Sequence, residues 1–124
     1  MQAITIQDQR YGAALEEVDF IKKHIFPGSF IPSVTRLVSA ASSSASLRLT
    51  ALHDIGIDYA KTLACWSTGF AAHADTLAAM GFDERFQRLW QFYFSYCEGG
   101  FRERAISDIQ AVFSNKPQPL ERGI

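Results

Sequence analysis

The sequence predicts an α/β fold, and three observations support that prediction. Strand-like and helical patterns alternate along the chain in the order strand, helix, short helix, strand, two helices, strand. The first strand pattern, Ala3–Gln7, begins almost at the first residue. The last strand pattern, Ile106–Ser114, follows an aromatic-rich helix. Because a domain rarely opens on a buried strand, we expect the chain to correspond to the later part of a larger α/β fold.

Composition and charge indicate one folded domain. The 124 residues suffice for a single modest core. Hydrophobic residues make up 48% of the chain and aromatic residues 13%, a balance typical of globular rather than disordered proteins. The formal net charge of -1 offers no basic field, so we expect no nucleic-acid partner. No apolar run approaches the roughly 20 residues of a membrane-spanning helix, so we also expect no transmembrane segment.

The cysteine pattern indicates a reducing compartment. Cys65 and Cys97 fall inside helical patterns, with no CxxC spacing between them. We therefore predict two buried free thiols rather than a disulfide, and a cytoplasmic location. The three histidines are scattered and form no HExxH motif, so we expect no metal site.

The first half of the chain predicts one strand and two helices. The β-branched run Ala3–Gln7 is typical of a buried strand, and apolar residues then recur at helical spacing over Asp8–Phe26. Pro27-Gly28 ends that helix. A short helix follows around Val34–Ser39, and the low-complexity segment Ala40–Ser46 is predicted to be an exposed loop.

The middle of the chain predicts a strand followed by a long helix. Apolar and polar residues alternate over Leu47–His53, and Asp54-Ile55-Gly56 is typical of a turn. The helix is expected from Ile57 to Met80, and its apolar stripe consists of Tyr59, Leu63, Trp66 and Phe70.

An aromatic helix and a last strand complete the predicted fold. Gly81 separates the two helices, Asp83 is a typical helix cap, and Gly99-Gly100 are expected to close the aromatic helix within Phe82–Arg104. Because aromatic side chains occur nearly all round this helix, it needs either a tight small core or a partner, a ligand or lipid to cover it. After the strand Ile106–Ser114, residues 115–124 are expected to form a flexible tail.

Two features of the helical segments allow both a functional and a structural interpretation. Tyr59 lies on the first turn of a helix just after a strand, where ligand crevices form in α/β sheets; alternatively it only begins the core stripe. Lys22 and Lys23 beside apolar residues either face a membrane surface or form an ordinary solvated helix face. The sequence contains neither GxGxxG after a strand nor GxxxxGK[ST].

Three segments carry a family resemblance. These are DFIKKHIFPGSFIPS at Asp19–Ser33, LHDIGIDYAKTLACW at Leu52–Trp66 and GFDERFQRLWQFYFSYCEGGFRER at Gly81–Arg104. In this order they resemble the C-terminal part of the cyclopropane-fatty-acyl-phospholipid synthase family of S-adenosylmethionine-dependent methyltransferases. The resemblance implies that residues 1–114 form the C-terminal portion of a class I (Rossmann-like) methyltransferase domain. It further implies about three strands with four helices, the last strand being antiparallel and lying between the other two.

The resemblance also implies a chemistry. Family members transfer a methylene group from S-adenosylmethionine to an unsaturated acyl chain of a membrane phospholipid, with bound bicarbonate as the base. Tyr59 matches the tyrosine of the bicarbonate pocket and is the expected catalytic residue. The segment Asp19–Ser33 matches the cover of the acyl-chain site, whose expected lining residues are Phe20, Ile25, Phe26 and Phe30.

The family's remaining functional residues have no counterpart in this sequence. Its glycine-rich cofactor loop, its acidic ribose-binding residue and its pocket Cys, Glu and His would all precede Met1. We therefore expect a C-terminal fragment or truncated relative that binds no cofactor and is inactive alone. The implied location is the cytoplasm, peripheral to the inner membrane face. The motifs do not distinguish this parent from a relative that methylates an amine or makes a methyl-branched chain.

The strand Ala3–Gln7 supplies a second hypothesis. In the implied sheet its outer edge is bare, and a bare edge is a template for another chain. The expected partners are a second copy in a homodimer or an N-terminal methyltransferase half. The alternative function is accordingly a stand-alone interaction module, a complementing subunit or a small lipid-binding dimer.

Overall fold

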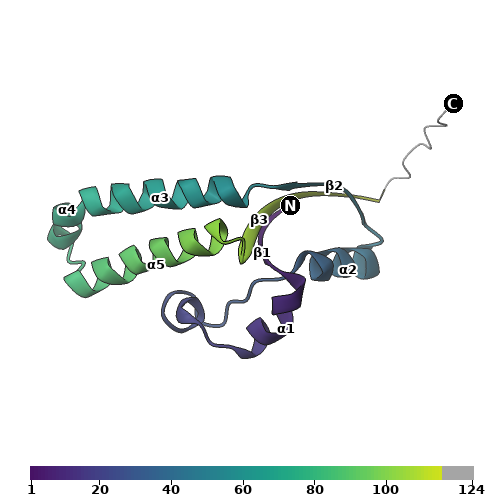
Figure 1. The fold of residues 1–124 in the computed structure, drawn as a ribbon, viewed down its shortest axis with the longest axis horizontal. Coiled ribbons are helices and arrows are strands. Elements are labelled where there is room, and N and C mark those ends of the chain that lie inside the picture. Colours follow the sequence, from purple (N-terminus) through teal and green to yellow (C-terminus); the bar gives the residue numbers. More distant parts are fainter. Residues whose placement is uncertain (116–124) are drawn as a thin grey trace.

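The computed structural model describes residues 1–115, which form one three-stranded sheet and six helical segments (Figure 1). The strands are β1 (Gln2–Ile6), β2 (Arg48–Asp54) and β3 (Ile106–Ser114). Their order is β1-β3-β2, and β3 is antiparallel to both neighbours. The predicted α/β class and the central antiparallel last strand are therefore confirmed. The predicted tail, apart from Asn115, lies outside the described residues.

The register of β1 leaves part of its outer edge unpaired. Met1 and Ala111 exchange two hydrogen bonds of 2.9 and 2.8 Å across the β1–β3 ladder. Because hydrogen-bonded pairs alternate in an antiparallel ladder, Gln2 and Ile4 point their backbone groups away from β3. At Ile6 the outer edge of β1 is paired with the segment before α2, because the Ile6 N–H donates to the Pro32 carbonyl over 3.0 Å.

The predicted first helix is wrong in its extent, because the structure divides it in two. Helix α1 (Asp8–Glu16) ends where Glu17 adopts an extended backbone, and a single π-helical turn, η1 (Ile21–Ile25), follows. Lys22 lies on η1, and its ammonium group donates to two carbonyls at the end of α1, those of Ala14 and Glu17. This tertiary cap ends α1 early and turns the chain toward α5.

Helix α2 (Val34–Ala45) is longer than predicted, so the expected exposed loop at Ala40–Ser46 is wrong. Ser33 caps its start by accepting a hydrogen bond from the Arg36 N–H over 3.3 Å. Ser46 ends the helix with a positive φ of 51°. The alanines in this segment favour helix, and the Ser43 hydroxyl bonds back to the Ser39 carbonyl within it.

The predicted long helix after β2 is broken once. It consists of α3 (Gly56–Ala72) and the short α4 (Ala74–Ala79), separated at His73. The four predicted helices of the family resemblance thus correspond to six helical segments among residues 1–115, counting the π-turn.

The aromatic helix is α5 (Glu84–Arg102), and it does not close at its glycine pair. Asp83 caps its start as predicted, with its carboxylate accepting from the Phe86 N–H over 2.8 Å. Gly100 lies inside the helix, where a Cβ would press against the Ile106 side chain at 3.2 Å, so a residue without a side chain suits this position. The helix instead ends at Arg102, and Arg104 takes a positive φ of 53° before β3 begins.

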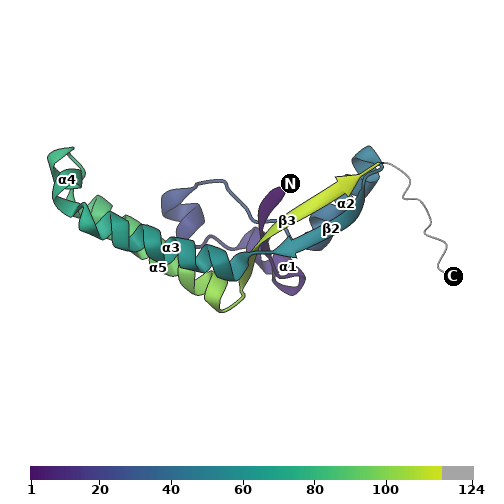
Figure 2. The ribbon, with the colours of Figure 1, turned by 90° about the horizontal axis from the view of Figure 1, so that it is seen from above.

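Helices α3 and α5 lie side by side and extend away from the sheet as a hairpin, with α4 at its far end (Figures 1 and 2). Leu63 on α3 and Phe94 and Phe101 on α5 form the core of this hairpin near the sheet. Among the described residues, six hydrophobic residues are buried, whereas thirteen large hydrophobic side chains are exposed. Phe94 is buried, but Phe92 is 52% exposed, so α5 is covered on only part of its surface.

We expect Asp83→Ala to lower the free energy of unfolding by about 1 kcal/mol, because the first turn of α5 loses a capping acceptor. Asp83→Asn is the matched control, since asparagine caps about as well as aspartate. Urea denaturation followed by circular dichroism measures both variants. Equal losses for the two substitutions would show that the cap contributes nothing.

Candidate functional site

Tyr59 is placed where the sequence predicted it, on the first turn of α3 just beyond β2. Its half-buried ring packs on Phe101 of α5 at a centroid distance of 5.0 Å and on Trp66 at 6.1 Å. The side chain therefore belongs to the core between α3 and α5 while keeping some exposure. Both interpretations of Tyr59 offered by the sequence, core stripe and site residue, are compatible with this position.

The surroundings of Tyr59 keep its phenol protonated. Burial raises the pKa of Tyr59, and the negative charge of Asp108 on β3 raises the pKa further. Asp108 is itself 1% exposed, and it accepts a hydrogen bond from the Gln2 side-chain amide over 2.7 Å. Near neutral pH the Tyr59 hydroxyl is thus a hydrogen-bond donor rather than a base.

Two further polar groups lie between Tyr59 and the segment before α2. Burial raises the pKa of Tyr93 to about 12 and the pKa of Cys97 to about 11. Tyr93 and Cys97 are close enough to hydrogen-bond, and the Tyr93 ring meets Phe26 edge-on at 6.2 Å. The sequence analysis gave neither residue a site role, although both lie one turn apart on the aromatic helix.

The four expected lining residues divide into two groups. Phe20 packs on Phe92 at 4.6 Å, and Phe26 packs on Tyr93, so both meet the same side of α5. Phe30 turns instead to Tyr11 of α1, at 5.8 Å. The fourth residue, Ile25, is half-buried on η1. The structure thus brings Phe20 and Phe26 together against the aromatic helix and places Phe30 elsewhere.

The two cysteines are free, as predicted, but neither is fully buried. Cys65 is exposed on α3, and Cys97 is half-buried on α5. The prediction of two buried thiols is therefore wrong. The helical periodicity could not show which side of α3 lacks a neighbour.

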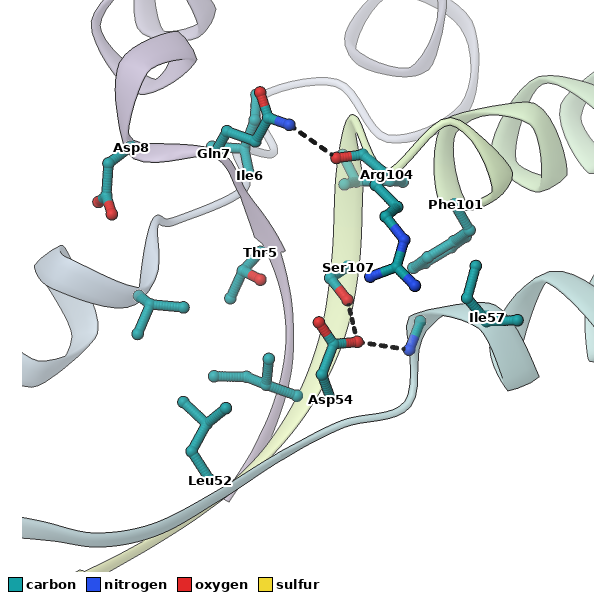
Figure 3. A pocket seen from close by; sticks show the side chains of 14 residues that line it. Thr5, Ile6, Gln7, Asp8, Leu52, Asp54, Ile57, Phe101, Arg104 and Ser107 are labelled. Carbon is teal, nitrogen blue, oxygen red and sulfur yellow. Dashed lines mark hydrogen bonds between the residues drawn. The ribbon is translucent and has the colours of Figure 1, made fainter.

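A cavity of about 240 Å³ opens at the carboxyl ends of β1 and β2 (Figure 3). Its polar lining includes Thr5 on β1, Asp54 on β2 and Ser107 on β3. Neither Tyr59 nor any of the four expected lining residues borders it. The sequence analysis missed this cavity. The sequence held one signal for it: a polar residue lies near the end of β1 and another near the end of β2. Because β3 is antiparallel to both strands, β1 and β2 are parallel and these ends meet at one edge of the sheet.

Residues 1–115 contain no group of three or more His, Cys, Asp or Glu side chains arranged to hold a metal ion. Their helices are all too short or too polar to cross a membrane.

Comparison with known proteins gives consistent matches. The family model described as mycolic acid cyclopropane synthetase matches residues 1–111. The chain is 37% identical over 119 residues to tuberculostearic acid methyltransferase UfaA1 of Mycobacterium tuberculosis, covering 96% of this chain and 28% of that protein. It is 38% identical over 95 residues to the cyclopropane-fatty-acyl-phospholipid synthase of Escherichia coli, covering 77% of this chain and 24% of that protein. The chain thus spans about a quarter of the length of these relatives.

Two solved structures share the fold. The mycolic acid cyclopropane synthase CmaA1, complexed with SAH and CTAB, aligns with a TM-score of 0.77 and 24% sequence identity, over 90% of this chain and 42% of that chain. The cyclopropane synthase MmaA2 from Mycobacterium tuberculosis aligns with a TM-score of 0.72 and 23% identity, over the same shares of 90% and 42%.

The difference between the two cysteines is testable. We expect iodoacetamide at pH 8 to label Cys65 at least about tenfold faster than Cys97, because the raised pKa of Cys97 suppresses the reactive thiolate. Mass spectrometry of peptides from partially labelled native protein measures the ratio. In 8 M urea the two rates should converge. Equal rates in the native protein would contradict the burial of Cys97.

Proposed function

Because the chain belongs to the mycolic acid cyclopropane synthetase family, we propose that it is the C-terminal part of a lipid-modifying methyltransferase. The proposed reaction is transfer of a methylene or methyl group from S-adenosylmethionine to an unsaturated acyl chain of a phospholipid. The observation that carries this proposal is the family match over residues 1–111, which runs from β1 into β3 without a break.

The described residues do not fit S-adenosylmethionine by themselves. The turn after β1 is Gln7-Asp8 rather than a glycine-rich loop that would admit a cofactor close to the backbone. Gly12, Gly69 and the pair Gly99-Gly100 lie inside helices, and Gly56 packs on Ser107. We therefore propose that this chain is inactive alone and requires the remainder of a methyltransferase domain to bind the cofactor.

Tyr59 is our proposed catalytic residue. Its protonated phenol is suited to donate a hydrogen bond to a bicarbonate ion, which supplies a proton acceptor when bound. Asp108 opposes an anion at the same place, so Tyr59 cannot hold one unaided. Further donors must come from outside residues 1–115 or from a second chain.

The acyl chain is proposed to contact the side of α5 that faces η1. Phe20 and Phe26 already pack there, and Phe92 and Tyr96 keep 52% and 43% of their surface exposed. Ile25 and Phe30 complete the proposed lining. An aromatic surface of this kind suits an apolar chain.

The exposed apolar side chains of one segment favour a proposed peripheral position at the inner membrane face. Val18, Phe26 and Phe30 are 71%, 49% and 50% exposed and lie on the segment that joins α1 to α2. Lys22 is not available to a membrane as the sequence suggested, because its ammonium group caps α1. The attraction would therefore rest on apolar contact more than on charge.

The outer edge of β1 favours a second candidate function, that of a complementing subunit. Gln2 and Ile4 direct their backbone groups outward, where a strand of another chain could continue the sheet. The proposed occupant is an N-terminal methyltransferase half, and a second copy in a homodimer is the alternative. Co-purification with a protein that carries the glycine-rich half would support the first occupant.

We expect isothermal titration calorimetry to detect no binding of S-adenosylmethionine by the 124-residue chain at cofactor concentrations up to about 100 μM. Such concentrations would reveal a dissociation constant in the micromolar range. The physical reason is the lack of a glycine-rich cradle within residues 1–115. Micromolar binding by the chain alone would overturn the proposed dependence on a missing half.

A chimera tests the role of Tyr59. This chain replaces the matching segment of the Escherichia coli synthase, and Tyr59→Phe is expected to lower kcat by about a hundredfold through loss of one hydrogen-bond donor. Tyr11→Phe is the matched control, because it removes a phenol hydroxyl from α1 and keeps the ring that packs on Phe30. Equal effects of the two substitutions, with both chimeras folded, would remove Tyr59 from the catalytic machinery.

A further inference from the structure

The Thr5 hydroxyl faces the cavity at the ends of β1 and β2. Thr5 as a residue is only 4% exposed, and none of the hydrogen bonds among residues 1–115 involves its side chain. Because no fully buried side-chain oxygen or nitrogen among these residues lacks a partner, the Thr5 hydroxyl is open to the cavity. The hydroxyl lies toward Asp54 and Ser107 (Figure 3). A ligand in the cavity can therefore bond to this hydroxyl in place of water.

Asp54 offers a second unused atom at the same place. Its Oδ1 accepts two hydrogen bonds, from the Ser107 hydroxyl at 2.5 Å and from the Gly56 N–H at 2.9 Å. No residue within 1–115 donates to its Oδ2, which points into the space between Asp54 and Thr5 (Figure 3). The two hydrogen bonds, together with the charge of Arg104, lower the pKa of Asp54, so the carboxylate is ionised near neutral pH.

At Asp54, the nearby charge of Arg104 favours a neutral donor over a cation. Arg104 lies beside Ser107 and would repel an ammonium group placed against Asp54 (Figure 3). The second carboxylate of the lining, Asp8, already accepts hydrogen bonds from Ser33 and Thr35 at the start of α2, which lower the pKa of Asp8. The unused atoms are therefore one oxygen that can only accept and one hydroxyl that can donate or accept.

The size and walls of the cavity restrict the ligand further. Its volume of about 240 Å³ is below the roughly 300–1,000 Å³ of pockets that hold drug-sized molecules. Val34, Leu52 and Ile109 supply apolar walls that suit the C–H groups of a short carbon chain. The site thus fits a few-carbon fragment with adjacent hydroxyl groups.

From this geometry we propose that the cavity binds a vicinal diol, with one hydroxyl donating to Asp54 Oδ2 and its neighbour bonding to the Thr5 hydroxyl. The diol is either part of a lipid headgroup that ends in glycerol or part of a free polyol or pentose. The site is separate from Tyr59, which does not border the cavity. Binding here therefore stands or falls independently of the proposed transfer reaction.

The primary test is an amide chemical-shift titration of the ¹⁵N-labelled 124-residue chain with glycerol. We expect saturable shifts at Thr5, Gly56 and Ser107. The matched probe 1,3-propanediol, whose hydroxyls are not adjacent, should bind at least about tenfold more weakly, as expected for the loss of one hydrogen bond. Shifts that stay linear with concentration, or equal affinities for the two probes, would overturn the proposal.

Two substitutions separate binding from folding. Thr5→Val keeps the shape and removes the hydroxyl, so it should weaken glycerol binding about three- to tenfold without lowering Tm. Asp54→Asn can retain the acceptor for Ser107 and Gly56 while removing the charge, and it should weaken binding about tenfold or more. Undiminished glycerol binding by either folded variant contradicts the assigned contacts.

The source of the diol is distinguished by two further probes. If short-chain phosphatidylglycerol binds more tightly than glycerol, and phosphatidylethanolamine with the same acyl chains binds weakly, the diol belongs to a lipid headgroup. Tighter binding of D-ribose than of glycerol identifies a free sugar. Preference for phosphatidylethanolamine over phosphatidylglycerol would overturn the choice of a neutral donor.

Discussion

The insertion of β3 between β1 and β2 is the constraint on which the rest of the structure depends. The flanking strands are separated by more than forty residues and have no contact of their own in the sheet, so β3 supplies the ladder for both. Its residues Asp108, Ile109 and Ala111 are among the most buried in the described chain. Because β3 is antiparallel to each neighbour, β1 and β2 are parallel, and their carboxyl ends meet at one edge of the sheet.

The core of the helical hairpin depends on the same strand. Ile106 at the start of β3 and Ile4 of β1 pack against the buried cluster around Leu63 and Phe101. Farther from the sheet, α3 packs on α5 and the η1 segment meets α5 through Phe20, yet outer aromatic side chains such as Trp66 and Phe92 stay about half exposed. An all-round apolar helix normally has neighbours on all sides. The partial burial of α3 and α5 agrees with a chain that spans 28% of the length of UfaA1 and 24% of the length of the Escherichia coli synthase.

The sequence predicted the strands better than the helix ends, and the reasons are physical. The bounds of β3 were predicted without error, because its apolar-rich run and the residues that flank it are local signals. The break after α1 was missed because it depends on Lys22 reaching back to carbonyls of another segment. Likewise, Gly99-Gly100 resemble a local helix end, whereas Gly100 lies within α5 at a close approach of the Ile106 side chain.

The candidate site shows the same division between local and tertiary information. The place of Tyr59 followed from a strand, a turn and a helix start that adjoin in sequence. Its electrostatic neighbour Asp108 and the Thr5 hydroxyl in the cavity come from other strands. Only the register of the sheet brings these groups close, and no single segment of the sequence encodes that register.

The strand β3 therefore contributes side chains to two chemically different sites, the surroundings of Tyr59 and the cavity. Successive side chains on β3 point to opposite faces, so Asp108 lies toward Tyr59 while Ser107 bonds to Asp54 in the cavity. A slip of one residue would exchange these faces and bury the wrong group at each place. Gly56 permits the observed register, because any larger residue there would overlap the Ser107 hydroxyl. The same glycine begins α3, and its N–H donates to the Asp54 carboxylate, so the start of the helix that carries Tyr59 is also bonded to the cavity.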